Sequence, residues 1–397
     1  MAFGFDAVSD YPFFEFSKKE VMRAGERIAG DLLWTAQSAP EIQKAFFIAN
    51  RWRDSHAYPM KSVRLSLAAF MRMNGIEGSV VSRLKRMQAI RKKLSRENSR
   101  FTLNQLQDLG GCRVIVNSIS DVDKLSKVLK SRLRHEVKRD DDYINSPKPD
   151  GYRSHHLILS YFGKGGAAVY NGRSIEVQVR TRLQHSWATA VESIGAFRRE
   201  DLKGNKGDQD WLRLFRLISG EFALAEARPE SPDLPPHLDR VKERVSLHNK
   251  LMASNTLDNL SYAVEWVRQS VQSLTKPLFY LISYNNSTRK VHVEPYFTPE
   301  SATRAYDMAE SSDNKTGLST TNVVLVAADK LDTVRFGYKN YFGDVHDFRD
   351  QLKMIIGEQN RDFDLIPQES VRPPFQSDDN PDLSWLRRSR FRKPKGS

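Results

Sequence analysis

The segment that most restricts how this chain can fold is the stretch 142–156, which has neither helical nor strand periodicity. Its two prolines fix the backbone angle φ, and Gly151 allows another part of the molecule to approach the backbone closely. Tyr152 offers a flat ring on which a nucleobase can stack. The positive charge comes from Lys148, Arg153 and His156. These features predict a loop that holds a phosphorylated nucleotide.

Two other segments each place one carboxylate at an expected strand. Asp108 lies just before the apolar residues 112–116, and Glu176 lies in the alternating segment 173–182. Two carboxylates at the mouth of a sheet, opposite a basic aromatic loop, suggest magnesium-dependent phosphoryl chemistry. The alternative is that both carboxylates only form ion pairs with Arg113 and Arg180.

In their order and spacing, these segments resemble the nucleotide pyrophosphokinase domain of the RelA/SpoT family. A fourth segment, residues 82–94, resembles the basic region with which the family binds ATP. The resemblance covers roughly residues 50–200, and it extends to small alarmone synthetases, including toxic members that a C-terminal domain restrains. It therefore implies a synthetase, with ATP and Mg²⁺ as ligands.

The resemblance also implies roles for individual residues. It makes Asp108 and Glu176 the catalytic residues and the Mg²⁺ ligands, and it places Glu176 to draw the proton from the attacking hydroxyl. The residues expected to bind ATP are Arg83, Lys85, Lys93 and Arg113. The residues expected to bind the acceptor are Lys148, Asp150, Tyr152 and His156. Since Arg83 and Lys85 would not share one helix face, residues 83–85 are expected to be extended.

Asp150 departs from the family pattern, which has Asn before the Gly-Tyr pair. A carboxylate there would repel a phosphate or recruit another cation, which favours a reduced affinity for guanine nucleotides or a different acceptor. The other interpretation is a tolerated exchange, because Asp and Asn both suit the turn.

The first functional hypothesis is an ATP-dependent transfer of diphosphate to the 3′-hydroxyl of GDP or GTP, which makes (p)ppGpp. The second is a toxic synthetase that modifies the 3′ end of tRNA and is restrained by its C-terminal unit until a protein trigger releases it. The third is a catalytically inactive RNA-binding module, which the intact Asp108, Glu176 and Tyr152 disfavour. Because His56 is the first histidine, the residues upstream are not expected to hold the metal cluster of the family's hydrolase domain.

Charge is concentrated on the expected synthetase. Residues 61–200 contain 27 Lys and Arg against 13 Asp and Glu, whereas the whole chain has a formal net charge of +13. Polyphosphate binding explains part of this excess, and a nucleic-acid partner would explain more. For residues 124–139 alone, a solvated basic helix face is the simpler interpretation.

Composition limits the class of protein. With one cysteine, Cys112, the chain has no disulfide framework and no cysteine-based zinc site, and the apolar neighbours of Cys112 predict burial rather than nucleophilic chemistry. No apolar run is long enough to cross a membrane, and the N-terminus does not resemble a signal peptide. A cytoplasmic protein without membrane contact is expected, and an oligomer is possible.

The expected fold class is α+β: a mixed β-sheet synthetase domain flanked by helices, a helical N-terminal segment and a small C-terminal α/β unit. The expected limits are 1–59 for the helical segment, 60–227 for the synthetase, 228–275 for a linker and long helix, 276–360 for a ββαβα regulatory unit, and 361–397 for a disordered basic tail. Residues 50–59 are expected to be a connector between helices. The clearest expected strands are 112–116, 155–162 and 174–180, and the clearest helix is 121–134.

Overall fold

The computed structural model describes residues 11, 14–30, 32–33, 35–95, 101–198, 200–263, 265–268, 277–285, 288, 290–315, 321–328, 334, 337–339 and 345–357. Residues 1–365 form one compact unit, and the second unit, 366–397, lies outside the described residues. The fold is α+β, as predicted. None of the helices in the described ranges has the length and apolar character that a membrane span requires.

Three helices precede the sheet: α1 (Lys18–Ala29), α2 (Ala39–Asp54) and α3 (Ala57–Met73). The first begins at a capping box, in which Ser17 and Glu20 satisfy each other's backbone N–H groups. The connector predicted at 50–59 was wrong, because only Ser55 and His56 separate α2 from α3. Trp52 and Met60, which lie in that stretch, are buried core residues of the two helices.

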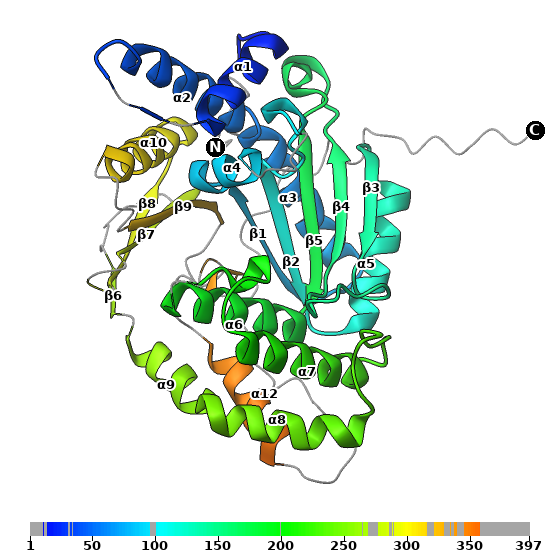
Figure 1. Cartoon of the computed structure of the whole chain (residues 1–397). Helices are drawn as coiled ribbons and strands as arrows, with labels where there is room; N and C mark the ends of the chain where they lie inside the picture. The colour runs from blue at the N-terminus through cyan, green and yellow to red at the C-terminus, as the bar shows by residue number, and fades with distance from the viewer. Residues whose placement is uncertain are drawn as a thin grey trace, which may run out of the picture. The chain divides into compact units, whose positions relative to one another are not determined.

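One mixed sheet organises the described part of the chain (Figure 1). Its strands are β1 (Gly78–Leu84), β2 (Gly110–Val116), β3 (Glu136–Asp142), β4 (His155–Ser160), β5 (Ser174–Thr181), β6 (Glu265–Arg268), β7 (Phe279–Asn285), β8 (Lys290–Tyr296) and β9 (Thr321–Ala327). Their order across the sheet is β3-β4-β5-β2-β1-β9-β7-β8-β6. The pairs β2–β5 and β6–β8 are parallel, and the other pairs are antiparallel.

The segment after β2 corrects one sequence interpretation. The predicted helix 121–134 exists as α5 (Ile119–Arg132), which begins at the N-cap Ser118. The apolar spacing of residues 124–139 predicts a helix as far as residue 139, but β3 already begins at Glu136. The strand was missed because its charged residues show little apolar alternation; it lies at the edge of the sheet and pairs only with β4.

Strand alternation gives the sheet two apolar faces. On β1, Val80 belongs to the core that α3 and α5 cover, and Val81 belongs to the core on the opposite face. On β7, Leu281 and Ile282 divide in the same way. Successive side chains of a strand point to opposite faces, so both faces of these strands are buried. Where β2, β5 and β4 meet, the second face instead carries polar side chains.

A helical layer lies beside that polar face: α6 (Arg182–Arg198), α7 (Gln209–Ala225), α8 (His237–Leu251), α9 (Ala253–Ala263) and α12 (His346–Gly357). The long or broken helix expected within 228–275 is a broken one: α8 and α9 are separated at Met252, which has a φ of 43°, and strand β6 follows α9. The proline-rich segment 228–236 between α7 and α8 is fixed to α8, because Arg240 bonds to the carbonyl oxygen of Pro235 and pairs with Glu230.

The C-terminal elements follow the predicted ββαβα order: β7, β8, α10 (Pro299–Lys315), β9 and α12. They also join the sheet and the helical layer formed by the preceding elements. Strand β9 pairs with β1 through Ala327 and Val326, and α12 packs on α6 and α9 (Figure 1). The domain limits drawn from the sequence stay predictions, and the tail 361–397 lies outside the described residues.

We expect Phe348→Ala to destabilise the whole compact unit 1–365, because Phe348 on α12 is 1% exposed and packs against Phe215 and Phe222 of α7. The free energy of unfolding should fall by about 3–5 kcal/mol, measured by urea denaturation. Met354→Ala on the same helix, where the side chain is 39% exposed, is the matched control and should cost much less. Similar losses for both variants would contradict the packing role of α12.

Candidate active site

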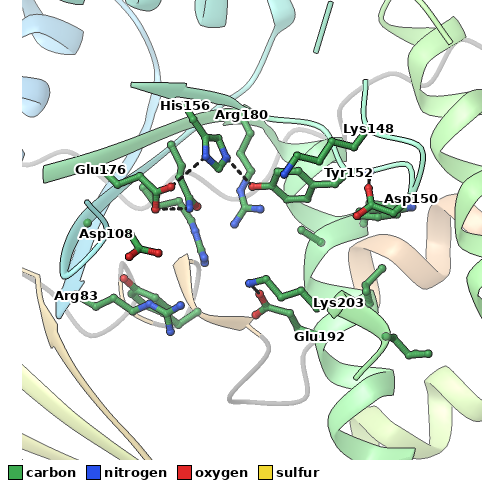
Figure 2. Close-up of a pocket in the computed structure, with 18 of the residues that line it drawn as sticks. Arg83, Asp108, Lys148, Asp150, Tyr152, His156, Glu176, Arg180, Glu192 and Lys203 are labelled. Atoms are coloured by element: carbon green, nitrogen blue, oxygen red, sulfur yellow. Dashed lines mark hydrogen bonds and ion pairs between the residues drawn. The ribbon is translucent and has the colours of Figure 1, made fainter. Parts of the chain in front are cut away.

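A cavity of ≈ 290 Å³ lies between the polar face of the sheet and the helical layer (Figure 2). Strands β1, β2, β4 and β5, the loop 143–154, helices α6 and α7, and Tyr338 all contribute to its lining. Of the ten predicted site residues, nine line this cavity: Arg83, Lys85, Asp108, Arg113, Lys148, Asp150, Tyr152, His156 and Glu176. The tenth, Lys93, reaches the site through Asp108.

Strand register sets the positions of these residues. Gly111 on β2 lies opposite Arg83 on one side and Glu176 on the other. Two residues further along, Gln178 on β5 lies opposite Arg113 on β2 and His156 on β4. Paired residues in a sheet point to the same face, so the four strands present their polar side chains together. The predicted extended conformation at 83–85 is confirmed as far as Leu84, where β1 ends.

Asp108 is held between two lysines. Its Oδ2 accepts hydrogen bonds from Lys85 Nζ at 2.8 Å and from Lys93 Nζ at 3.0 Å. Burial would raise the pKa of Asp108, but the two ammonium groups outweigh it and lower the pKa. Burial also lowers the pKa of Lys85, against the attraction of Asp108. The carboxylate is therefore ionised near neutral pH, and it neutralises cations that a phosphate could bind instead.

Glu176 begins a second polar chain. Its Oε1 lies 3.1 Å from His156 Nδ1, and His156 Nε2 lies 2.9 Å from the hydroxyl of Tyr152. Gln178 Nε2 donates to Glu176 Oε2 at 2.9 Å. Burial would raise the pKa of Glu176, but the contact with His156 outweighs it and lowers the pKa. The ionised Glu176 is thus oriented by two neighbours, and Tyr152 is linked to it through His156.

The donor set fits one hard cation. Asp108 Oδ1 is buried and accepts no hydrogen bond from the described residues. Glu176 is close enough to Asp108 for the two charges to interact. Within the described ranges no three His, Cys, Asp or Glu residues gather at metal-binding distance. Two carboxylates with room for further oxygen ligands suit Mg²⁺, which keeps waters and phosphate oxygens in its octahedron.

The loop 143–154 is ordered by its own contacts. Asp150 Oδ1 accepts from the backbone N–H of Tyr152 at 2.9 Å, so this carboxylate forms the turn that Asn would also form. Gly151 has a φ of +86°, and a Cβ there would lie 3.1 Å from Ser219 and 3.3 Å from Trp187. The close approach predicted at Gly151 is therefore made to α6 and α7, which fix the loop.

The cations of this loop divide between two roles. Lys148 Nζ lies 4.1 Å from the ring centre of Tyr143 and 5.3 Å from that of Tyr152, at the edge of the cavity. Arg153, in contrast, is 2% exposed and donates to Ser219 Oγ and the carbonyl oxygen of Ile144. Its predicted contribution to nucleotide binding was wrong, because its guanidinium anchors the loop to α7.

The C-terminal part of the chain contributes a contact that the sequence did not predict. Arg113 Nη1 donates to the carbonyl oxygen of Gly337 at 2.7 Å. The ring of Tyr338 lies 5.2 Å from the Arg113 guanidinium and 5.6 Å from that of Arg83. An aromatic ring from the C-terminal segment therefore covers two of the predicted ATP-binding cations.

Three further charged residues of the cavity were not predicted as site residues: Arg180, Glu192 and Lys203. Glu192 on α6 pairs with Lys203 of the short turn after it. Arg180 could have been found, because it continues the alternation of Glu176 and Gln178 on β5. Cys112 is buried as predicted, and burial raises the pKa of its thiol to about 12. His155, on the opposite face of β4, bonds to Asp140.

Residues 82–200 match a family model described as the region found in RelA / SpoT proteins. This part of the chain is similar to the RelA/SpoT region. The resemblance that the sequence motifs indicated is thereby confirmed, and every predicted site residue lies inside the matched region. The region includes the end of β1, all of β2 and all of β5, and both carboxylates lie in it: Asp108 just before β2 and Glu176 on β5.

Curated relatives match the RelA/SpoT region and its surroundings. The GTP pyrophosphokinase of Escherichia coli K12 is 29% identical over 167 residues, which is 41% of this chain and 21% of that protein. The GTP pyrophosphokinase YwaC of Bacillus subtilis is 33% identical over 117 residues, which is 28% of this chain and 55% of that protein. The chain thus spans about a fifth of the first relative and about half of the second.

Solved structures that match this chain are covered over most of their own length. The small alarmone synthetase 2 of Bacillus subtilis is 23% identical and has a TM-score of 0.36, with 44% of this chain and 92% of that chain covered. The small alarmone synthetase 1 of the same organism, bound to its product pppGpp, is 22% identical with a TM-score of 0.36, and 54% of this chain and 99% of that chain are covered.

Proposed function

We propose that this protein is a Mg²⁺-dependent diphosphotransferase that moves the β,γ-diphosphate of ATP to the 3′-hydroxyl of GDP or GTP and so makes (p)ppGpp. The observation that carries the proposal is the joint position of Asp108, Glu176 and Tyr152 in one cavity lined by cations. The RelA/SpoT region and the relatives named GTP pyrophosphokinase support the same reaction.

The reaction needs two nucleotides placed side by side. The 3′ oxygen of the acceptor attacks the β-phosphorus of ATP, the bond from that phosphorus to the α-phosphate oxygen breaks, and AMP leaves. Such a transfer depends mostly on positioning and on neutralising charge. Asp108 and Glu176 would hold Mg²⁺, which supplies neutralising charge to the triphosphate. Lys85 and Lys93, now on Asp108 Oδ2, are within reach of the same phosphates.

The acceptor hydroxyl must lose a proton as it attacks. Glu176 is ionised and oriented, so it can accept that proton through a hydrogen bond. His156 fixes the carboxylate and joins it to Tyr152, whose ring offers a face to the acceptor base. The base platform and the proton acceptor are therefore coupled by one hydrogen-bonded chain.

The 3′ end of tRNA is the second candidate acceptor. The observation that favours it is the excess of cations over anions in residues 61–200, 27 against 13, which exceeds the need of two small nucleotides. Asp150 does not discriminate, because its Oδ1 already caps the turn at Tyr152. Both acceptors present a ribose hydroxyl beside a base, so the same residues would serve either one.

The experiment incubates the full chain and Mg²⁺ with ATP labelled in the γ-phosphate, adding GDP, GTP or bulk tRNA in separate reactions. We expect label in a guanosine 3′-diphosphate product, and no transfer without Mg²⁺. Label in tRNA alone would replace the proposed acceptor with the second candidate. Label in none of the three would leave the protein without the proposed activity.

Asp108→Asn and Glu176→Gln should each lower the rate of transfer at least about 100-fold. Asp108→Asn should also lower the free energy of unfolding by about 1–3 kcal/mol, because Lys85 and Lys93 lose their shared counter-charge. Matched controls are Asp233→Asn and Glu136→Gln, both at exposed positions, which should retain the wild-type rate. Wild-type turnover in either site variant refutes its assigned role.

Tyr152→Ala should weaken acceptor binding by roughly 1–3 kcal/mol, because the stacking face is lost. Tyr152→Phe keeps the face but removes the hydroxyl that bonds His156 at 2.9 Å. We therefore expect Phe to retain the acceptor KM and to lower kcat about fivefold, equivalent to roughly 1 kcal/mol. Steady-state kinetics with varied acceptor separates the two effects, and identical kinetics for Ala and Phe would exclude a stacking role.

We also propose that the C-terminal unit restrains the enzyme, with release by a protein trigger as the regulatory step. The supporting contact is Tyr338, whose ring covers the guanidinium groups of Arg83 and Arg113. A donor nucleotide that uses these cations must displace the ring. The contact lies on the donor side of the cavity and not at Tyr152 on the acceptor side.

Tyr338→Ala should strengthen apparent ATP binding about five- to thirtyfold, because roughly 1–2 kcal/mol of cation–π competition is removed. Tyr338→Phe keeps the ring and should behave as wild type. Equilibrium binding of a non-hydrolysable ATP analogue checks this, and melting curves identify any variant that has lost its fold. Equal ATP affinity for folded Ala and Phe variants argues against restraint by Tyr338.

A further inference from the structure

Arg180 occupies an unusual environment for a charged side chain. It is 3% exposed and lies at the end of β5, where its backbone pairs with Ile115 of β2. Figure 2 shows its guanidinium pointing into the middle of the cavity, between His156 and Glu192. The alternation that exposes Glu176 and Gln178 to the cavity also directs Arg180 there.

No hydrogen bond or ion pair from the described residues reaches this guanidinium, and its buried Nε has no acceptor. Arg53 and Arg153, which are also buried, each have bonded partners: Arg53 pairs with Asp54 and Asp307, and Arg153 donates to Ser219 and the carbonyl oxygen of Ile144, although its Nη2 lacks an acceptor. Burial and then the nearby Arg113 lower the pKa of Arg180 to about 9. A buried charge without a partner is costly, so an arrangement of this kind indicates a ligand that supplies the missing acceptor.

The neighbours of Arg180 indicate where that ligand lies. Its electrostatic neighbours include Tyr152, which belongs to the acceptor side, and Arg113 and Tyr338, which belong to the donor side. The carboxylate of Glu192 also attracts Arg180, but its ion pair is with Lys203. A ligand at Arg180 therefore sits between the two nucleotide positions. A guanidinium presents a planar pair of N–H donors that matches two phosphoryl oxygens.

We propose that Arg180 is a substrate-binding residue that contacts the phosphoryl oxygens of the diphosphate between the donor and the acceptor. This inference rests on the proposed function for the identity of the phosphate group. Within the site it divides the cations by position: Lys85 and Lys93 at Asp108, Lys148 and His156 at the acceptor, and Arg180 between them. It also explains why the cavity contains a guanidinium to which no described residue forms a hydrogen bond or an ion pair.

The test uses the full chain and inorganic pyrophosphate, so it does not depend on turnover. Calorimetric titration should give a measurable Kd for the wild type and a Kd about 10- to 100-fold weaker for Arg180→Met. Arg180→Met should also raise the melting temperature without ligand, since a buried unpaired charge is removed. Arg53→Met is the matched control: it removes a buried guanidinium that is bonded to Asp54 and Asp307 and does not line the cavity, and it should lower the melting temperature while leaving the pyrophosphate Kd unchanged.

Arg180→Lys keeps a positive charge but loses the paired donors, and we expect about tenfold weaker pyrophosphate binding. If the Arg180→Met variant does not fold, the Arg180→Lys variant still allows the pyrophosphate Kd to be compared with that of the wild type. An unchanged Kd in a folded Arg180 variant, or no pyrophosphate binding by the wild type, overturns the inference. A lower melting temperature with an unchanged Kd would assign Arg180 a structural role. Failure of the labelled-ATP reaction would instead reject the proposed function and leave the binding result standing.

Discussion

The parallel pairing of β2 with β5 is the constraint on which the site depends. It sets Gly111 opposite Glu176 and Arg113 opposite Gln178, so residues separated by about 65 positions in the chain share one face. Gly111 has no side chain, and a Cβ there would come within 4.0 Å of Glu176 Oε2. The space beside Glu176 therefore stays open toward Asp108 and Lys85. A shift of this pairing by one residue would turn Glu176 into the apolar core.

Charge balance in the cavity follows from that pairing. Asp108 compensates Lys85 and Lys93, Glu176 contacts His156, and Glu192 pairs with Lys203. Each pair is exchangeable, because an incoming phosphate can replace the carboxylate as the partner of a cation. Arg180 has no such internal partner among the described residues and is the cation most dependent on a ligand. An anionic ligand would thus act as a partner for the cations of the site and would not have to disrupt the surrounding structure.

The C-terminal elements complete the fold as well as covering part of the site. Strand β9 continues the sheet from β1, and Phe348 and Leu352 of α12 fill the core beneath α6 and α7. A chain ending near residue 228 would expose that apolar layer, so a truncated fragment cannot separate regulation from folding. The Tyr338 contact is better examined by single substitutions, because its ring meets Arg83 and Arg113 without forming the helical core.

The sequence by itself determined the local features. Turn residues fixed the loop 142–156, alternation placed Glu176 on a strand face, and apolar periodicity located α5 and the ββαβα order of the C-terminal elements. These features depend on neighbours within a few residues, so they can be predicted from the sequence alone. The edge strand β3 could not be predicted in this way, because its charged residues face solvent and its sequence shows little apolar alternation.

Only the tertiary structure decided which side chains meet. Arg153 and Lys148 are both cations of one loop, so the sequence could not assign them different roles. In the structure, Arg153 donates hydrogen bonds to Ser219 and Ile144, whereas Lys148 lines the cavity. Nor could it reveal that Tyr338 lies on Arg113, or that Arg180 is buried without a partner. Contacts between residues far apart in the chain depend on strand register and helix packing, which are set by the whole core and not by any local segment.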